Sequence, residues 1–262
     1  MLLTFDIGNT SITLGIFDGE KFVKELRLPS DRDMPQNEYE EIISSLLKNF
    51  EITDCVVGSV VEEITPKVSC AIKRIFNIEP LIVSDLIETG VKIRTDFPSQ
   101  VGADRIANAV AAKNLYKLPV IVVDFGTATS FDVVNSKGEF IGGVIALGLN
   151  TQMKSLNKFT SKLPKTEVAI SSRAIGSNTT DAILSGVIRG TACMIDGMIK
   201  QCENELGEKA TIVSTGGYSG LIANYLTRPF DFINTTLTLD GLRIIYEKNC
   251  NKNADLCRRQ CE

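Results

Sequence analysis

The sequence predicts an α/β fold built from two similar halves, each a mixed sheet flanked by helices, with a cleft between them. The main observation is an internal repeat: residues 2–19 read LLTFDIGNTSITLGIFDG and residues 120–138 read VIVVDFGTATSFDVVNSKG. The aligned pairs are Asp6 with Asp124, Gly8 with Gly126, Asn9 with Thr127, Thr10 with Ala128 and Ser11 with Thr129. A second observation is that helical periodicity follows each copy, as expected for two α/β halves. A third is that 44% of the 262 residues are hydrophobic, which is ample for a buried core.

Each copy of the repeat predicts a strand, a glycine-containing turn, a returning strand and a third strand. Apolar runs predict first strands at 2–5 and 120–123. The returning strands are expected at 12–17 and 130–134, and the third strands at 22–28 and 140–147. Helices are then expected at 37–50 in the first half and 179–206 in the second.

The segments between and after the repeats complete the two halves. Strands are expected at 54–61 and 80–84, with helices at 64–76 and 103–116. Residues 210–220 predict a strand running into a Gly-rich turn, and residues 238–249 a final helix. The domain boundaries expected from this pattern are 1–117 and 118–249, with the last helix packing back on the first half. Residues 250–262 are expected to form a frayed polar tail.

The chain contains no histidine, which excludes several classes of active site. Ser-His-Asp and Cys-His nucleophilic sites, the HExxH zinc motif and histidine general-base catalysis are all ruled out. Any chemistry must therefore use carboxylates, hydroxyls, backbone dipoles, Lys, Arg and a hard metal ion.

The charge and apolar patterns predict a cytoplasmic protein that binds neither nucleic acid nor membrane. The net charge of −4 provides no global basic field to attract nucleic acid or an anionic membrane. The N-terminus meets Asp6 too early for a signal peptide, and no later apolar run is expected to approach the roughly 20 residues of a membrane span.

The seven cysteines do not predict a disulfide framework. Cys55, Cys70, Cys193 and Cys202 fall in apolar periodic segments, where a reduced thiol behaves as a small hydrophobe. Cys250, Cys257 and Cys261 cluster near the end at spacings that fit no common zinc pattern. Stray thiols on a solvated tail and a metal or redox role both remain open for these three.

The repeated turns have the chemistry of a polyphosphate site. A strand that ends at an aspartate and turns through Gly, Ser and Thr presents backbone N–H groups and hydroxyls beside a carboxylate that can hold Mg²⁺. A single turn of this kind is commonly structural. Its duplication, together with a third Gly-rich turn at 214–220, favours a nucleotide site. No Gly-Lys dipeptide and no G-x-G-x-x-G occurs, so the Walker A and dinucleotide-binding motifs are excluded.

Longer motifs in this order resemble those of the type III pantothenate kinases. The stretches are DIGNT (6–10), GADRIANAVAA (102–112), VVDFGTATSFDVV (122–134), GGVIALGL (142–149), IGSNTTDAILSG (175–186) and TGG (215–217). The resemblance runs up to about residue 249. It implies membership of the acetate and sugar kinase, heat-shock protein 70 and actin superfamily, whose fold is a pair of ribonuclease H-like halves.

The resemblance also implies an activity and a set of site residues. The activity is ATP-dependent phosphorylation of pantothenate at its primary hydroxyl, the first step toward coenzyme A, in a homodimer that needs Mg²⁺ and K⁺ or NH₄⁺. The implied ATP contacts are Asp6, Ile7, Gly8, Asn9, Thr10, Ser11, Ile12, Thr13 and Thr127. The implied pantothenate contacts are Thr95, Gly102, Ala103, Asp104, Arg105 and Thr179, with Asp104 as the proton acceptor. Asp124 is implied as the monovalent-cation ligand and Asp6 as a Mg²⁺ ligand, directly or through water.

One position departs from the family pattern, and several residues have a structural alternative. The family commonly has a tyrosine where this chain has Thr95, and Phe97 could supply the missing apolar surface. Asp104 could be a helix cap, or a base kept ionised by the helix N-terminus and Arg105. Arg105 could be a surface residue, or a planar partner for the pantothenate carboxylate. Asp124 could simply be satisfied by turn amides.

Two other functions fit the same scaffold. One is a nucleotide-dependent assembly or switch protein, although such proteins usually need more than 262 residues. The other is a regulatory protein that binds ATP without transferring phosphate, which the intact set of Asp6, Asp104 and Asp124 disfavours.

Overall fold

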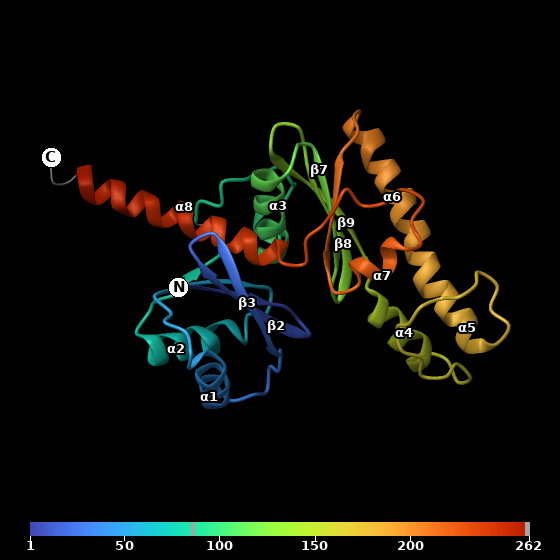
Figure 1. Ribbon diagram of the computed structural model, residues 1–262, viewed down its shortest axis with the longest axis horizontal. Helices are drawn as coiled ribbons and strands as arrows, with labels where there is room; N and C mark the ends of the chain where they lie inside the picture. Colours follow the sequence, from blue (N-terminus) through green and yellow to red (C-terminus); the bar gives the residue numbers. More distant parts are fainter. Residues whose placement is uncertain (85–86, 260–262) are drawn as a thin grey trace. The chain divides into compact units, whose positions relative to one another are not determined.

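The chain folds into two compact α/β units (Figure 1). The structure is a computed structural model that describes residues 1–84 and 87–259, with side chains described up to residue 250. Unit 1 comprises Met1–Asn114 together with the C-terminal segment from Thr236, and unit 2 comprises Leu115–Thr235. The expected pair of α/β halves, each with a mixed sheet flanked by helices, is confirmed.

Unit 1 is a mixed sheet in the order β3-β2-β1-β4-β5. Strands β1–β2 and β2–β3 are antiparallel, whereas β1–β4 and β4–β5 are parallel. The strands of this sheet are β1 (Leu2–Ile7), β2 (Ser11–Asp18), β3 (Lys21–Pro29), β4 (Asp54–Ser59) and β5 (Leu81–Ile82). The short strand β6 (Lys92–Ile93) follows along the chain and is not part of this sheet. The helices are α1 (Gln36–Leu47), α2 (Thr65–Phe76), the 3₁₀ turn η1 (Pro98–Gln100), α3 (Ala103–Leu115) and α8 (Leu237–Arg259).

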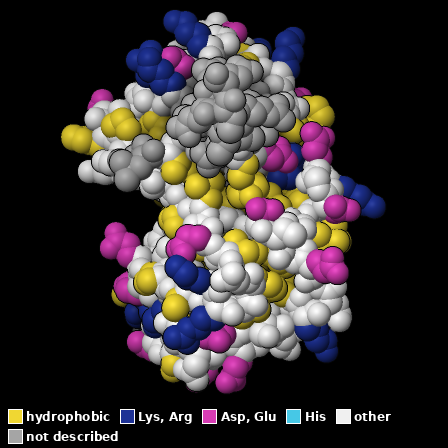
Figure 2. Space-filling view, turned by 90° about the vertical axis from the view of Figure 1, so that its left-hand side faces the viewer, with side chains coloured by type: hydrophobic (Ala, Val, Ile, Leu, Met, Phe, Trp, Pro, Cys, Tyr) yellow, Lys and Arg dark blue, Asp and Glu magenta, His cyan; other side chains and the backbone are white. Residues whose placement is uncertain are grey.

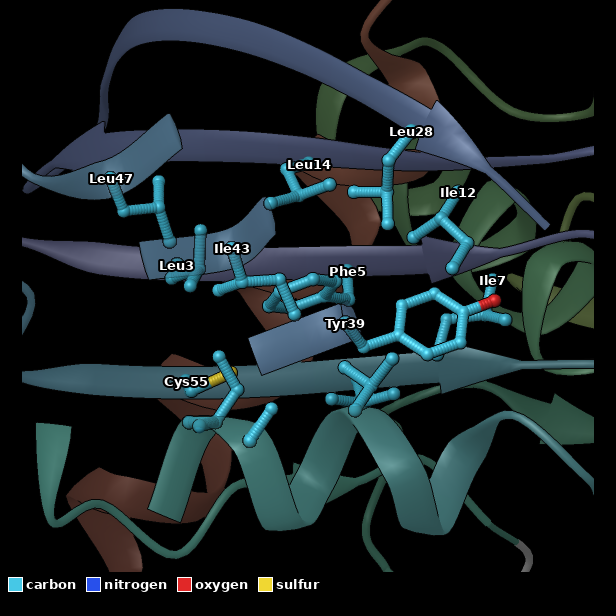
Figure 3. Packing of buried hydrophobic residues seen from close by; sticks show 14 of the residues in the cluster. Leu3, Phe5, Ile7, Ile12, Leu14, Leu28, Tyr39, Ile43, Leu47 and Cys55 are labelled. Atoms are coloured by element: carbon cyan, nitrogen blue, oxygen red, sulfur yellow. The ribbon is translucent and has the colours of Figure 1, made fainter. Parts of the chain in front are cut away.

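Helices α1 and α2 cover one face of this sheet. Alternate residues along a strand point to the same face, so Leu3, Phe5 and Ile7 of β1 lie on one side together. Tyr39 and Ile43 of α1 pack against them, as Figure 3 shows. Helix α2 begins with a proline in its first turn and ends at Asn77, whose left-handed backbone donates its N–H to the Lys73 carbonyl.

Helices α3 and α8 cover the opposite face. Leu239 and Leu242 of α8 approach the glycines of the sheet: a Cβ on Gly58 would lie 2.7 Å from a Leu242 methyl. Helix α8 also crosses α3 closely, because a Cβ on Gly241 would collide with the Ala107 backbone. The hydroxyl of Tyr246 donates a hydrogen bond to Asp54, which fastens α8 to the start of β4.

Unit 2 repeats the plan with strands in the order β11-β10-β7-β8-β9. Strands β7, β8 and β9 form the antiparallel meander, and β10 and β11 add in parallel. The strands are β7 (Val120–Phe125), β8 (Ala128–Val134), β9 (Glu139–Leu147), β10 (Thr211–Gly216) and β11 (Phe232–Ile233). The helices are α4 (Leu149–Lys158), α5 (Thr179–Leu184), the π-helical turn η2 (Ser185–Arg189), α6 (Gly190–Leu206) and α7 (Ser219–Ala223).

The continuous helix from Thr179 to Leu206 is more apolar than expected from the sequence. By length and composition alone it could cross a membrane, so the expectation that no run is long enough was wrong. One side of it packs into the core of unit 2 through residues such as Ile195 and Ile199. A core helix of a globular domain passes the same test, so this feature is weak support for a membrane span.

Other differences from the sequence prediction lie in short or polar helices. Helix α4 (LNTQMKSLNK) was missed because it is short and mostly polar, although Leu149, Met153 and Leu156 recur at helical spacing. Helix α7 was expected to be part of a turn. Helix α8 does not end at residue 249 but continues to Arg259, since no Gly or Pro interrupts this segment. The side chain of Cys257 and all of Cys261 lie outside the described residues, so the question about the three C-terminal thiols stays open.

Charged side chains of both signs are mixed on the face shown in Figure 2. Lys and Arg alternate there with Asp and Glu rather than gathering into one patch. This distribution agrees with the modest net charge of −4.

The close crossing of α8 over α3 predicts that Gly241→Ala destabilises the protein. A methyl group at this position requires the α3 backbone to move, and overpacking of this kind typically costs about 1–3 kcal/mol. Gly197→Ala in the exposed part of α6 is the control, because nothing lies within 4 Å of its Cβ position. That variant should be neutral or more stable by up to about 1 kcal/mol, since Ala is the better helix former. Urea denaturation measures both free energies, and equal effects would contradict the close packing.

Candidate functional site

The first candidate segment is the turn that joins β1 to β2. The Gly8 N–H donates to the Ser11 carbonyl at 3.1 Å, so the chain reverses within Gly8–Thr10. Asn9 and Thr10 are exposed at the tip, whereas Asp6 is partly buried at the base. The turn therefore offers polar side chains and backbone amides to solvent beside a carboxylate.

Two of the expected ATP contacts cannot use their side chains. Ile7 and Ile12 are fully buried in the core against α1 and α2 (Figure 3). They are paired across the β1–β2 hairpin, as Asp6 is with Thr13. Any contact that Ile7 or Ile12 makes with a ligand is therefore through the backbone.

Asp104 lies in the first turn of α3 and is partly buried. Its Oδ1 accepts the Arg105 N–H at 2.8 Å. Gly102 leaves room for this carboxylate, because a Cβ there would lie 2.5 Å from Asp104 Oδ1. Burial raises the pKa of Asp104, while the Arg105 N–H bond and the Arg105 charge oppose the rise. The helix N-terminus and Arg105, which favour the ionised form, are outweighed by burial in the folded chain.

Strand β4 brings the first turn and the start of α3 together. Asp6 of β1 is in register with Gly58 of β4, and the Val60 N–H donates to the Ile7 carbonyl at 3.1 Å. A Cβ on Gly58 would lie 3.7 Å from that of Ala103. The carboxyl ends of β1 and β4 thus meet the N-terminus of α3, which carries Gly102 to Arg105.

Thr95 lies between β6 and η1, upstream of α3. Its hydroxyl is buried and has no hydrogen-bond partner among the described residues. A buried unpaired hydroxyl is uncommon, because such groups usually find a partner. Phe97, two residues on, is 64% exposed and is free to provide apolar surface.

The second candidate segment is the equivalent turn of unit 2. The Gly126 N–H donates to the Ala128 carbonyl at 2.9 Å. The Thr127 carbonyl accepts hydrogen bonds from the Gly148 N–H at 3.2 Å and from Thr151 Oγ1 at 2.7 Å. The Asp124 carboxylate lies beside this turn, with Oδ1 4.0 Å from the Cβ position of Gly126.

Two further glycine positions complete the unit 2 site. Gly216 ends β10 with φ of +87°, and a Cβ there would lie 2.5 Å from the Phe125 carbonyl oxygen. A Cβ on Gly148 would lie 2.5 Å from the Thr127 carbonyl oxygen. The three Gly-containing segments therefore touch backbone to backbone. The convergence of Gly148 and α4 on this site was not foreseen from local pattern, although Gly148 falls within one of the family-like motifs.

Thr179 begins α5, at the edge of an apolar pocket of about 560 Å³. Asn178 caps the helix by accepting the Asp181 N–H at 2.9 Å. The pocket is lined by Leu147, Gln152, Ser155, Leu156, Leu163, Thr179, Ala182, Ile183, Gly186 and Val187. Its size fits a small organic molecule or an apolar side chain of another protein.

Both aspartates of the repeat have the chemistry of hard-cation ligands. Among the described residues, three or more acidic, Cys or His side chains do not gather in one place. Mg²⁺ sites of the nucleotide type use one or two carboxylates together with phosphate oxygens and water. Asp6 beside Asn9 and Thr10 in unit 1, and Asp124 beside the Gly126–Thr127 turn in unit 2, each offer one carboxylate.

The chain matches known proteins over most of its length. A family model described as type III pantothenate kinase matches residues 2–201. A type III pantothenate kinase of Dehalococcoides mccartyi is 43% identical over 253 residues, which cover 95% of this chain and 96% of the relative. Both matches name the family that the sequence motifs resemble, and they extend over most of the chain.

Solved structures resemble the fold at low sequence identity. A Baf family protein of Campylobacter jejuni has a TM-score of 0.60 at 22% identity, covering 95% of this chain and 99% of the other. A ROK family glucokinase of Streptomyces griseus, in complex with glucose and AMPPNP, has a TM-score of 0.54 at 11% identity. That match covers 95% of this chain and 99% of the glucokinase. These likenesses confirm the duplicated actin-like fold.

The burial of Asp104 predicts that Asp104→Asn stabilises the protein. Because the pKa of Asp104 is higher in the folded than in the unfolded chain, the folded protein is favoured while this carboxyl is protonated. This contribution is complete below the unfolded pKa of about 4 and is lost as the pH rises through the folded pKa. Asparagine keeps an oxygen for the Arg105 N–H but has no charge to bury. The variant should therefore gain most at alkaline pH, and the gain should shrink toward pH 4. Urea midpoints across this pH range measure it, and a pH-independent difference would contradict the burial effect.

Proposed function

Because the chain belongs to the type III pantothenate kinase family, we propose that it transfers the γ-phosphate of ATP to the primary hydroxyl of pantothenate. The product is 4′-phosphopantothenate, and the reaction is the first step of coenzyme A biosynthesis. The observation that supports this best is the meeting of the first turn and the start of α3 at the end of β4. A phosphate-binding turn and a proton acceptor are the two parts that the reaction needs.

The two turns are proposed to bind the ATP phosphates. Backbone amides of a Gly-containing turn make a concave site for anions. In unit 1 this role falls to residues 6–13, and in unit 2 to Thr127. Mg²⁺, held by Asp6 directly or through water, would offset the negative charge of the phosphates.

Asp104 is proposed to accept the proton of the substrate hydroxyl. As the hydroxyl oxygen forms its bond to the γ-phosphorus, the bond to the ADP oxygen breaks and the proton passes to the Asp104 carboxylate. Most of the barrier in phosphoryl transfer is lowered by alignment and charge neutralisation, so a weak base suffices. The partial burial of Asp104 moves its pKa toward that of a better base.

The neighbours of Asp104 are proposed to hold pantothenate. The Arg105 guanidinium suits the pantothenate carboxylate, since its planar donors match two oxygens. Gly102 and Ala103 would bring the backbone close to the substrate. The unpaired buried hydroxyl of Thr95 would gain a partner from the bound substrate, and Phe97 would add apolar surface.

Asp124 is proposed to bind the monovalent cation, K⁺ or NH₄⁺. Its carboxylate lies beside the Gly126–Thr127 turn, so a cation there would lie next to the proposed phosphate contact of Thr127.

A cytoplasmic location is also proposed. It accords with the free thiols of the described cysteines, which are Cys55, Cys70, Cys193, Cys202 and Cys250.

A homodimer is proposed to cover the outer face of β9 and the pocket at Thr179. Ile145 and Leu147 lie two residues apart on β9 and share one face, with exposed fractions of 65% and 55%. Ile141, where the β8–β9 register shifts, is a further exposed apolar residue of this strand. A contiguous exposed apolar patch commonly marks an interface. Because Leu147 also lines the pocket, the same contact would place Thr179 beside the partner chain.

Pantothenate-dependent release of ADP is the experiment that tests the activity. The enzyme should turn over in K⁺ faster than in Na⁺, and Asp104→Asn should lower kcat by about 10²–10⁴-fold while leaving ATP binding nearly unchanged. The acid limb of the pH–rate profile should lie above the pKa of an ordinary aspartate, because the ionised form is needed. Turnover without pantothenate would contradict the proposed substrate, and near-normal activity of the variant would remove Asp104 from its role.

Ile145→Asp is expected to weaken the dimer by about tenfold or more, because an unpaired carboxylate would be buried at the contact. The control is Val23→Asp on β3, which replaces another exposed strand residue, 41% exposed, outside the proposed interface. Light scattering after size-exclusion chromatography, over a dilution series, measures the mass of each variant. A monomeric unsubstituted protein, or a dimer that Ile145→Asp leaves unchanged, would overturn this interface.

A further inference from the structure

Arg32 is a cation held against the first turn. Its Nη2 donates a hydrogen bond to Asn9 Oδ1 at 2.9 Å, and the side chain is 55% exposed. The turn itself has no positive side chain, since residues 6–13 read DIGNTSIT. A polyphosphate bound there would face the Asp6 carboxylate and would need positive charge from elsewhere.

The backbone around Arg32 is fixed rather than loose. Lys67 Nζ donates to the Arg32 carbonyl at 2.7 Å and to the Met34 carbonyl at 2.9 Å. Tyr39 is fully buried. Its hydroxyl donates a hydrogen bond to the Asp31 carbonyl at 2.8 Å and accepts one from the Asp31 N–H at 3.1 Å. Arg32 therefore has an anchored backbone and a side chain that reaches the turn.

The present partners of the guanidinium can be exchanged for a phosphate. Arg32 Nη1 lies 3.6 Å from Glu63 Oε1, and the Glu63 side chain is 56% exposed. An exposed ion pair of this length contributes little to stability. Phosphate oxygens offer shorter, charge-assisted and bidentate hydrogen bonds, which a planar guanidinium matches well.

We propose that Arg32 binds the phosphates of ATP at the first turn, leaving Glu63 when the nucleotide arrives. This inference rests on the proposed function, since it assumes that the turn holds ATP. Arg32 would then supply in unit 1 the positive charge that a lysine supplies in other phosphate loops.

The test is binding of Mg-ATP by titration calorimetry, without an acceptor. Arg32→Gln should weaken binding by about 10–100-fold, as expected for the loss of hydrogen bonds to a charged group. Arg32→Lys should recover only part of the loss, because an ammonium is a point charge. The matched control is Arg74→Gln, which removes another Arg–Glu pair, from Arg74 Nη1 of α2 to Glu40 Oε2 of α1 at 3.2 Å, and should leave binding unchanged.

Two further variants separate phosphate binding from a structural role. Glu63→Gln should leave Mg-ATP affinity unchanged or raise it, because it frees the guanidinium. If Arg32 acted only through Asn9, the double variant Asn9→Ala with Arg32→Gln would bind no more weakly than Asn9→Ala alone. We expect instead that the double variant binds Mg-ATP clearly more weakly than Asn9→Ala alone, with a combined loss smaller than the product of the two single effects, because residues in direct contact are coupled.

The outcomes distinguish this inference from the proposed function. Normal Mg-ATP affinity in Arg32→Gln, or a loss in Glu63→Gln equal to that in Arg32→Gln, would overturn the role of Arg32. Failure of the unsubstituted enzyme to release ADP with pantothenate would overturn the proposed substrate instead, and the calorimetric result would still stand. A failure of the unsubstituted protein to bind Mg-ATP would overturn both.

Discussion

Close backbone contact between glycine-containing turns is the constraint on which the candidate site depends. In unit 2, side chains at Gly148 and Gly216 would collide with the carbonyl oxygens of Thr127 and Phe125. Without these glycines the segments after β7, β9 and β10 could not converge, and the amides and hydroxyls they carry would be spread apart. A phosphate site built from backbone donors needs this density of polar groups, because each amide contributes only a partial charge.

In unit 1, strand β4 brings the separate segments of the candidate site close together. Gly58 admits Leu242 of α8 on the covered face of the sheet, and the strand end places Val60 between Ile7 and Gly102. The helix that carries Asp104 is thereby fixed relative to the first turn by direct contacts, not by a flexible loop. Helix α8, added from the far end of the chain, completes this packing through Gly241 against Ala107. The position of the Asp104 carboxylate thus depends on residues more than a hundred positions away in sequence.

The partial burial of Asp104 links stability to chemistry. Removing a carboxylate from water disfavours its charged form, so the folded protein bears a cost for keeping Asp104 where it is. The same burial raises the pKa, which would make the group a stronger proton acceptor in the role proposed for it. The surrounding core of unit 1 is extensive enough to tolerate one such locally unfavourable group.

The sequence alone determined the duplicated α/β plan, the family and most of the residues near the two turns. It could do so because the repeat places Asp, Gly and hydroxyl residues at matching positions, and strand periodicity is a local property. It missed α4 and α7, which are short and contain few apolar residues, and it misjudged the end of α8 and the apolarity of the Thr179–Leu206 helix.

Only the tertiary structure decided which distant groups meet. The burial of Asp104, the exposed apolar face of β9 and the hydrogen bond from Arg32 to Asn9 all arise from contacts between segments that no local pattern relates. Solvent exclusion and charge proximity are set by packing in three dimensions, so they cannot be read from the spacing of residues along one chain.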